Sequence, residues 1–186
     1  MTSNRHHNEY PDGAACFWTS SVVGFVPVLH NETAAKCLLG IWDHYRRVYN
    51  VKLLGYGIMP NHFHLVVRSD KGDDVRRFLR RTLGLSSLEI GGLVERAAAG
   101  GDILSGSWMK VFTSHAGSRS KHAIWKERGR AFPVTSGDVM RQKLTYMHGN
   151  PVRMGLVPRP EDWKLSSAAW YERGEGPIVV DEVPGW

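Results

Sequence analysis

The most constraining feature of this sequence is the order in which strand-like and helix-like segments follow one another. Segments rich in aromatic and β-branched residues predict four strands, at residues 15–23, 51–58, 62–68 and 123–134. Apolar residues at helical spacing predict three helices, at residues 31–47, 73–83 and 137–148. Strands and helices mixed in this order predict the α+β class, with a mostly antiparallel, ferredoxin-like sheet and helices packed on one face.

A chain of 186 residues favours one domain. We place it at residues 14–170 and predict flexible termini at 1–13 and 171–186. Residues 84–122 contain repeated glycines and only a short helical pattern near 93–99, which predicts an insertion or a long functional loop. Pro151 is expected to end the last helix, because the residue before a proline avoids the helical region.

The charge distribution indicates a polyanionic partner. The net charge is +6, and the basic residues gather in stretches at 68–81, 119–130 and 141–153, whereas residues 172–186 are acidic on balance. This pattern is typical of a nucleic-acid binder, although a solvated helix face explains any single arginine equally well. The residues predicted to contact DNA are Arg68, Arg76, Arg77, Arg80, Arg81, Arg119, Lys121, Lys126, Arg128, Arg130 and Arg153. Trp108 and Phe112 could stack on unpaired bases or form the small core of the insertion.

Cysteine usage and hydropathy exclude several classes of protein. Cys16 and Cys37 are the two cysteines and form no Cys-x-x-Cys pair, so the common zinc-finger patterns and a disulfide framework are absent. No apolar run approaches the length of a membrane span, and the N-terminal stretch is polar. We therefore expect a cytoplasmic protein with no membrane partner.

Two histidines in the strand at 62–68 suggest half of a metal site. Side chains two residues apart on a strand point to the same side, so His62 and His64 project together while Phe63 faces the other way. Imidazole is a common ligand of divalent metals. The alternative is that both histidines are ordinary strand residues facing solvent.

Tyr146 and Asn150 form a second candidate pair, because residues four apart share a helix face. The phenol could attack a phosphodiester, and the amide oxygen could complete a metal shell. Alternatively, Tyr146 is a core aromatic and Asn150 simply ends the helix before Pro151. Together with the histidines and the basic residues, the pair predicts metal-assisted attack of Tyr146 on phosphorus, with the 3′ oxygen leaving. A phosphotyrosine conserves the energy of the broken bond, so the step could also rejoin DNA.

Two longer blocks resemble a known family. Residues 57–67 (GIMPNHFHLVV) are similar to the His-hydrophobe-His strand of the single-tyrosine HUH transposases. Residues 146–157 (YMHGNPVRMGLV), followed by 160–163 (PEDW) and Ser166-Ser167, resemble the branch of REP-associated tyrosine transposases. Trp125-Lys126 also resembles a segment of this branch, and the similarity covers most of residues 15–170.

This resemblance implies a ferredoxin-like fold, a Mg²⁺ or Mn²⁺ ion, and cleavage of single-stranded DNA near hairpins formed by palindromic repeats. It implies that His62, His64 and Asn150 are metal ligands, that Tyr146 is the nucleophile, and that a monomer is expected rather than a dimer. The chain departs from the branch in its longer region 84–122 and at Met154, where a small residue is common.

Other functions remain open at this point. A DNA-binding regulator that has lost cleavage could act at the same repeats, although the intact set of His62, His64, Tyr146 and Asn150 argues against it. A hydrolytic metalloenzyme acting on another substrate is a third possibility, but the His-x-Glu and Cys-x-x-Cys motifs of zinc deaminases are absent. Replication initiators and relaxases also use His-hydrophobe-His strands, and the Asn-Pro-Val-Arg block points away from them.

Overall fold

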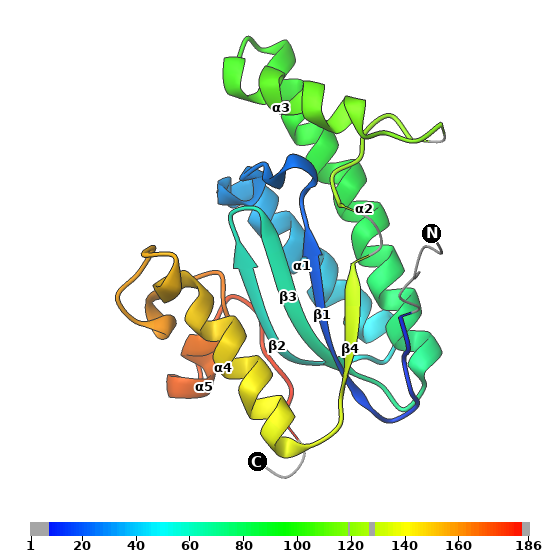
Figure 1. The fold of residues 1–186 in the computed structure, drawn as a ribbon, viewed down its shortest axis with the longest axis vertical. Helices are drawn as coiled ribbons and strands as arrows, with labels where there is room; N and C mark the ends of the chain where they lie inside the picture. The colour runs from blue at the N-terminus through cyan, green and yellow to red at the C-terminus, as the bar shows by residue number, and fades with distance from the viewer. Residues whose placement is uncertain (1–7, 119, 127–128, 184–186) are drawn as a thin grey trace, which may run out of the picture.

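A single four-stranded antiparallel sheet forms the centre of the computed structural model, which describes residues 8–118, 120–126 and 129–183. Its strands lie in the order β2-β3-β1-β4 (Figure 1). Their bounds are β1 (Ala15–Ser21), β2 (Lys52–Met59), β3 (His62–Arg68) and β4 (Arg130–Val134). The α-helices are α1 (Glu32–Val48), α2 (Gly72–Ala99), α3 (Ile103–Ser114), α4 (Gly137–Arg153) and α5 (Ala168–Arg173). Short 3-10 turns occupy Val23–Phe25, Val28–His30 and Pro160–Asp162.

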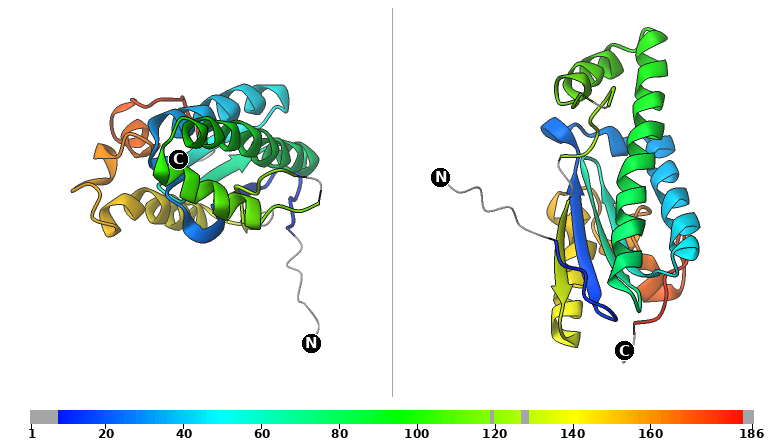
Figure 2. Two further views of the ribbon diagram at one scale, coloured as in Figure 1. Left: turned by 90° about the horizontal axis from the view of Figure 1, so that it is seen from above. Right: turned by 90° about the vertical axis from the view of Figure 1, so that its right-hand side faces the viewer.

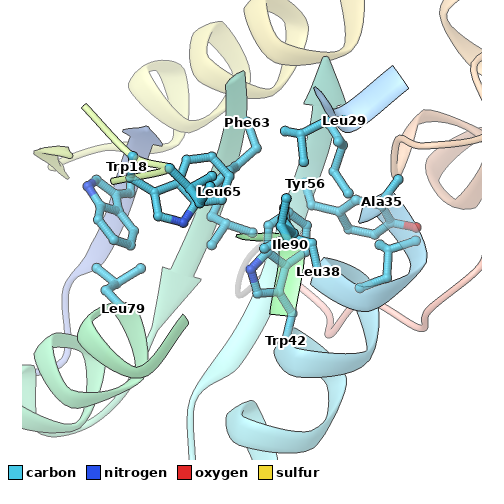
Figure 3. Close-up of a cluster of buried hydrophobic side chains, with 14 of the residues drawn as sticks. Trp18, Leu29, Ala35, Leu38, Trp42, Tyr56, Phe63, Leu65, Leu79 and Ile90 are labelled. Carbon is cyan, nitrogen blue, oxygen red and sulfur yellow. The ribbon is translucent and has the colours of Figure 1, made fainter. Parts of the chain in front are cut away.

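The predicted α+β class is confirmed, but the helices cover both faces of the sheet rather than one. α1 and α2 pack on the face that carries Trp18, Phe63 and Leu65 (Figure 3). α4 packs on the other face, where it covers Phe17 and Val66 (Figure 2, right). The reason lies in the strand alternation: both faces carry apolar side chains, and an antiparallel sheet of this kind buries both only between two layers.

The region 84–122 is mainly helical, so the prediction of a long loop was wrong. α2 continues to Ala99 and turns back as α3, and the hairpin extends beyond the end of the sheet in Figure 1. Ile90, Val94 and Phe112 are buried, which offsets the cost of about 1 kcal/mol for each glycine inside a helix. Gly101, with φ of +94°, makes the turn, and the Asp102 carboxylate caps α3 by accepting from the Ser105 N–H at 2.9 Å. None of the helices in the described ranges is long and apolar enough to cross a membrane.

The predicted strand at 123–134 is confirmed only for its second half. Trp125, in its first half, forms an isolated bridge with Val22 and packs edge-on against Phe63, with ring centres 4.9 Å apart. Its indole N–H donates to Ser86 Oγ at 2.8 Å. Trp125 thus fastens the segment after α3 to both α2 and the histidine-bearing strand.

The C-terminal segment lies against β2. The N–H of Ile58 donates to the carbonyl of Leu165 at 2.8 Å, which covers the outer edge of the sheet. Where a flexible tail was expected, α5 forms, Val180 is buried, and the Asp181 carboxylate accepts from the Leu53 N–H at 2.8 Å. These contacts hold residues that the sequence pattern alone placed outside the folded domain.

Candidate active site

β3 presents both histidines to the face covered by α4, as predicted. The ring centres of His62 and His64 lie 4.9 Å apart. Phe63, between them, is fully buried on the opposite face. Phe17 on the neighbouring strand stacks against His64 with ring centres 5.3 Å apart, so the site is built on a packed surface of the sheet.

Two glycines of β2 allow α4 to approach this surface closely. A Cβ added at Gly55 would lie 2.6 Å from the Leu144 side chain, and one at Gly57 would lie 3.0 Å from the Met147 side chain. Because Gly57 pairs with His64, Met147 lies beside the histidine row, and Tyr146 and Asn150 are carried with it. The sequence signal for this contact was available: alternate glycines in a strand mark a close approach of another element.

Tyr146 lies beside the histidines, with its ring centre 5.7 Å from that of His64. Its side chain is 49% exposed, so the phenol faces the surface and is not a core aromatic. Asn150 is buried, one turn further along α4. The Arg153 guanidinium lies 4.8 Å from the centre of the Tyr146 ring and donates to Asn150 Oδ1, which joins these two predicted site residues.

Pro151 lies inside α4 and does not end it, contrary to the prediction. The helix runs on to Arg153, since a proline in the last turn forfeits only one hydrogen bond. The carbonyl of Pro151 accepts from the Leu156 N–H at 2.9 Å. The extra turn is what brings Arg153 under Tyr146.

Burial keeps both imidazoles neutral near pH 7. It lowers the pKa of His64 to about 3, with smaller contributions from His62, Arg153 and Lys143. Burial also lowers the pKa of His62. A neutral imidazole has a lone pair free to bind a cation, which a protonated one lacks.

The donor atoms that remain available fit a divalent cation. Both ring nitrogens of His64 are buried and have no hydrogen-bond partner in the described chain. His62 Nδ1 lies 2.8 Å from Asn61 Oδ1, which leaves Nε2 free. Asn150 Oδ1 has a second lone pair besides the one that accepts from Arg153. The described residues contain no cluster of three or more His, Cys, Asp or Glu side chains, so two imidazoles and one amide are the donors at hand.

Lys143 is a site residue that the sequence analysis missed. Its ammonium lies 5.1 Å from the Phe17 ring centre and 5.2 Å from that of Phe132. Its spacing of three residues before Tyr146 was the available signal, because such residues share a helix face. Lys143 and Arg153 thus provide positive charge on either side of the phenol.

The other predicted DNA contacts are distributed unevenly. Arg130 and Arg68 lie on the histidine face, the latter donating to the Gly13 carbonyl at 2.8 Å. The exposed arginines of α2 lie beyond the opposite face of the sheet, and these are Arg76, Arg77, Arg80 and Arg81. Lys121 pairs with Glu95, and Lys126 lies over the Phe25 ring at 5.2 Å. Arg119 and Arg128 fall outside the described residues.

Phe112 and Trp108 in the region 84–122, and His148 on α4, have structural roles. Phe112 is fully buried and Trp108 is partly buried against the main core, so the core interpretation is confirmed for Phe112. His148 Nε2 lies 2.8 Å from Ser167 Oγ, and burial lowers the pKa of this imidazole to about 4. His148 therefore ties α4 to the C-terminal segment.

The comparison with one known structure agrees with this architecture. The structure of a REP-associated tyrosine transposase bound to a REP hairpin superposes with a TM-score of 0.59 at 17% identity, over 98% of this chain and 93% of that chain. A crystal structure from Deinococcus radiodurans R1, provisionally assigned as a transposase, gives a TM-score of 0.43 at 15% identity, over 81% of this chain and 97% of that chain. No protein-family model and no curated sequence matches. The chain has the fold of a REP-associated tyrosine transposase, in agreement with the resemblance of its two motif blocks.

Proposed function

We propose that this protein is a metal-dependent endonuclease and strand transferase for single-stranded DNA, acting at hairpin-forming palindromic repeats. The observation that carries the proposal is the convergence of an exposed phenol, Tyr146, on two imidazoles from a different element, of which His64 is buried and His62 is partly buried. The fold is that of a transposase whose structure holds a REP hairpin, which supports DNA of this kind as the partner.

His62, His64 and Asn150 would hold the cation. A bound Mg²⁺ or Mn²⁺ would polarise the scissile phosphate and spread the negative charge that develops on its oxygens. Every one of these donors is a neutral group, so the site itself brings no negative charge that would repel a phosphate. Histidine ligands also accept manganese, so both ions are proposed.

Tyr146 would supply the nucleophile. Its oxygen attacks phosphorus, the bond to the 3′ oxygen breaks, and the 5′ phosphate remains on the tyrosine. Arg153 lies over the Tyr146 ring and Lys143 over the neighbouring Phe17 ring, and both cations favour the phosphate in this position by charge. Attack by a free 3′ hydroxyl on the phosphotyrosine reverses the step and can join a different strand.

A comparison of the wild-type chain with Tyr146→Phe tests the proposal. A hairpin oligonucleotide with an unpaired flank is incubated with each protein and Mn²⁺, and the products are separated under denaturing conditions. We expect a cleaved strand and a protein-linked 5′ fragment from the wild type, and neither from the variant, although both proteins bind the hairpin. Binding without cleavage by the wild type would favour the alternative of a regulator that has lost its catalytic function.

A further inference from the structure

A cavity of about 330 Å³ opens next to the histidine site and takes no part in the chemistry described above. It is lined by Thr19, Ser20, Ser21, Phe25, Lys126, Gly129 and Arg130. Thr19 pairs with His64 and Ser21 pairs with His62 across β1 and β3, so the cavity borders the candidate active site. Its volume is at the lower end of small-molecule pockets, about 300–1,000 Å³, and is too small for a duplex.

The cavity arises from an interruption in strand pairing. β1 pairs with β4 as far as Thr19 and Arg130, and pairing resumes at the bridge between Val22 and Trp125. Two residues of β1 separate these two points, whereas the other segment has four residues between them, so the ladder cannot continue residue for residue. A gap of this kind beside an active site is a built feature of the strand pairing, as bulges are.

The backbone around Phe25 is held in an unfavourable conformation. Phe25 has φ of +52°, a left-handed value that costs a bulky residue energy, and its ring is 56% exposed. Phe25 follows Gly24, with φ of +61°, in a turn that the Val26 N–H closes on the Val23 carbonyl at 3.3 Å, and the aromatic residue projects from this turn. Strained residues of this type concentrate at sites that hold a ligand.

Two basic side chains, Lys126 and Arg130, line the cavity. Neither forms an ion pair with a carboxylate in the described ranges. Two such cations beside an exposed aromatic ring favour a ligand that carries both a phosphate and a base.

We infer that this cavity binds one unpaired nucleotide of the DNA strand that is cleaved at Tyr146, an inference that rests on the proposed function. Phe25 provides the surface on which the base stacks. Lys126 and Arg130 hold the adjoining phosphate. The site therefore fixes the strand at one nucleotide and sets the position of the scissile phosphate relative to the tyrosine.

Binding measurements without cleavage test this inference separately from the proposed function. In the Tyr146→Phe background with chelator, single-stranded oligonucleotides that carry one abasic position at a time are titrated by fluorescence anisotropy. Stacking of one base implies about tenfold or greater weakening at one position only. We expect Phe25→Ala to weaken binding of the intact strand by the same factor. In this variant the abasic position should cause no further loss of affinity. Phe25→Trp should bind the intact strand like the parent and keep the loss of affinity at that position.

Leu88→Ala is the matched control, because Leu88 is an exposed apolar residue on α2, outside the cavity lining, and this variant should bind like the parent. Wild-type affinity of Phe25→Ala, or an equal loss at every abasic position, would overturn the inference. The two failures can be distinguished. If only the proposed function fails, no covalent product forms, but binding affinity still depends on one nucleotide position.

Discussion

The ring of Tyr146 on α4 lies 5.7 Å from the imidazole of His64 on β3, although these elements are far apart in the sequence. The proximity depends on how closely α4 packs against the sheet. A helix displaced by one side-chain layer would carry the phenol away from the histidines. The contacts beneath α4 are therefore as important to the proposed chemistry as the reacting groups.

Gly55→Ala tests this packing. The new methyl group would lie 2.6 Å from the Leu144 side chain, so we expect destabilisation by about 1–3 kcal/mol and at least tenfold slower cleavage. Chemical denaturation and single-turnover cleavage measure the two effects. Gly84→Ala, where no atom lies within 4 Å, should instead raise stability by up to about 1 kcal/mol and leave cleavage unchanged. Wild-type behaviour of Gly55→Ala would show that α4 can move without consequence.

His64→Phe tests whether this residue is present for metal binding rather than for stability. The two buried ring nitrogens lack partners, and a phenyl ring can stack on Phe17, so we expect the variant to be about 1 kcal/mol more stable in chelator. Mn²⁺ should raise the melting temperature of the wild type and not that of the variant. A variant that is less stable in chelator, or that still responds to Mn²⁺, would contradict the metal role.

Arg153→Gln tests the guanidinium that joins the two site residues of α4. Loss of its charge beside Tyr146 and of its bond to Asn150 should slow cleavage by about 10²-fold, with the fold preserved. Arg159→Gln is the matched control, since Arg159 pairs with Asp162 in an exposed position and should have a normal rate. Equal rates for both variants and the wild type would exclude a catalytic contribution of Arg153.

The salt dependence of binding tests which cations contact DNA. Lys143→Gln should lower the slope of log K against log salt by about one, because one phosphate contact is lost. Arg76→Gln should leave the slope unchanged, since Arg76 pairs with Asp73 at 2.9 Å and lies on α2, across the sheet from the histidines. An equal decrease for both variants would mean that Arg76 also contacts the DNA backbone, as the basic stretch at 68–81 predicts.

The antiparallel sheet and the shared orientation of His62 and His64 could be predicted from the sequence, because both follow from local alternation. The length of α2 could not. Its glycines indicate a loop by propensity, and only burial of Ile90 and Val94 against distant residues makes the helix favourable. Propensity describes the isolated segment, whereas the helix is stabilised by tertiary contacts.

The face on which α4 packs was also beyond prediction from periodicity. The three-residue spacing of Leu144 and Met147 predicts an apolar face of the helix but does not identify the surface on which this face packs. That surface is created by Gly55 and Gly57 on β2. The same contacts explain Lys143, which becomes a candidate site residue only once α4 is in place, and they bring the predicted Arg153 beside Tyr146. The set of His62, His64, Tyr146 and Asn150 could be predicted because motif resemblance supplied the pairing of two elements, whereas Lys143 lies outside those motifs and required the structure.

The most direct test of the central claim is to locate the covalent bond. The wild-type chain is incubated with Mn²⁺ and a hairpin oligonucleotide, digested, and analysed by tandem mass spectrometry for a peptide linked to a 5′ phosphate. Our account predicts a nucleotide adduct on Tyr146 that forms with Mn²⁺ and disappears in chelator. Strand cleavage without any adduct on Tyr146, or an adduct on another residue, would contradict it.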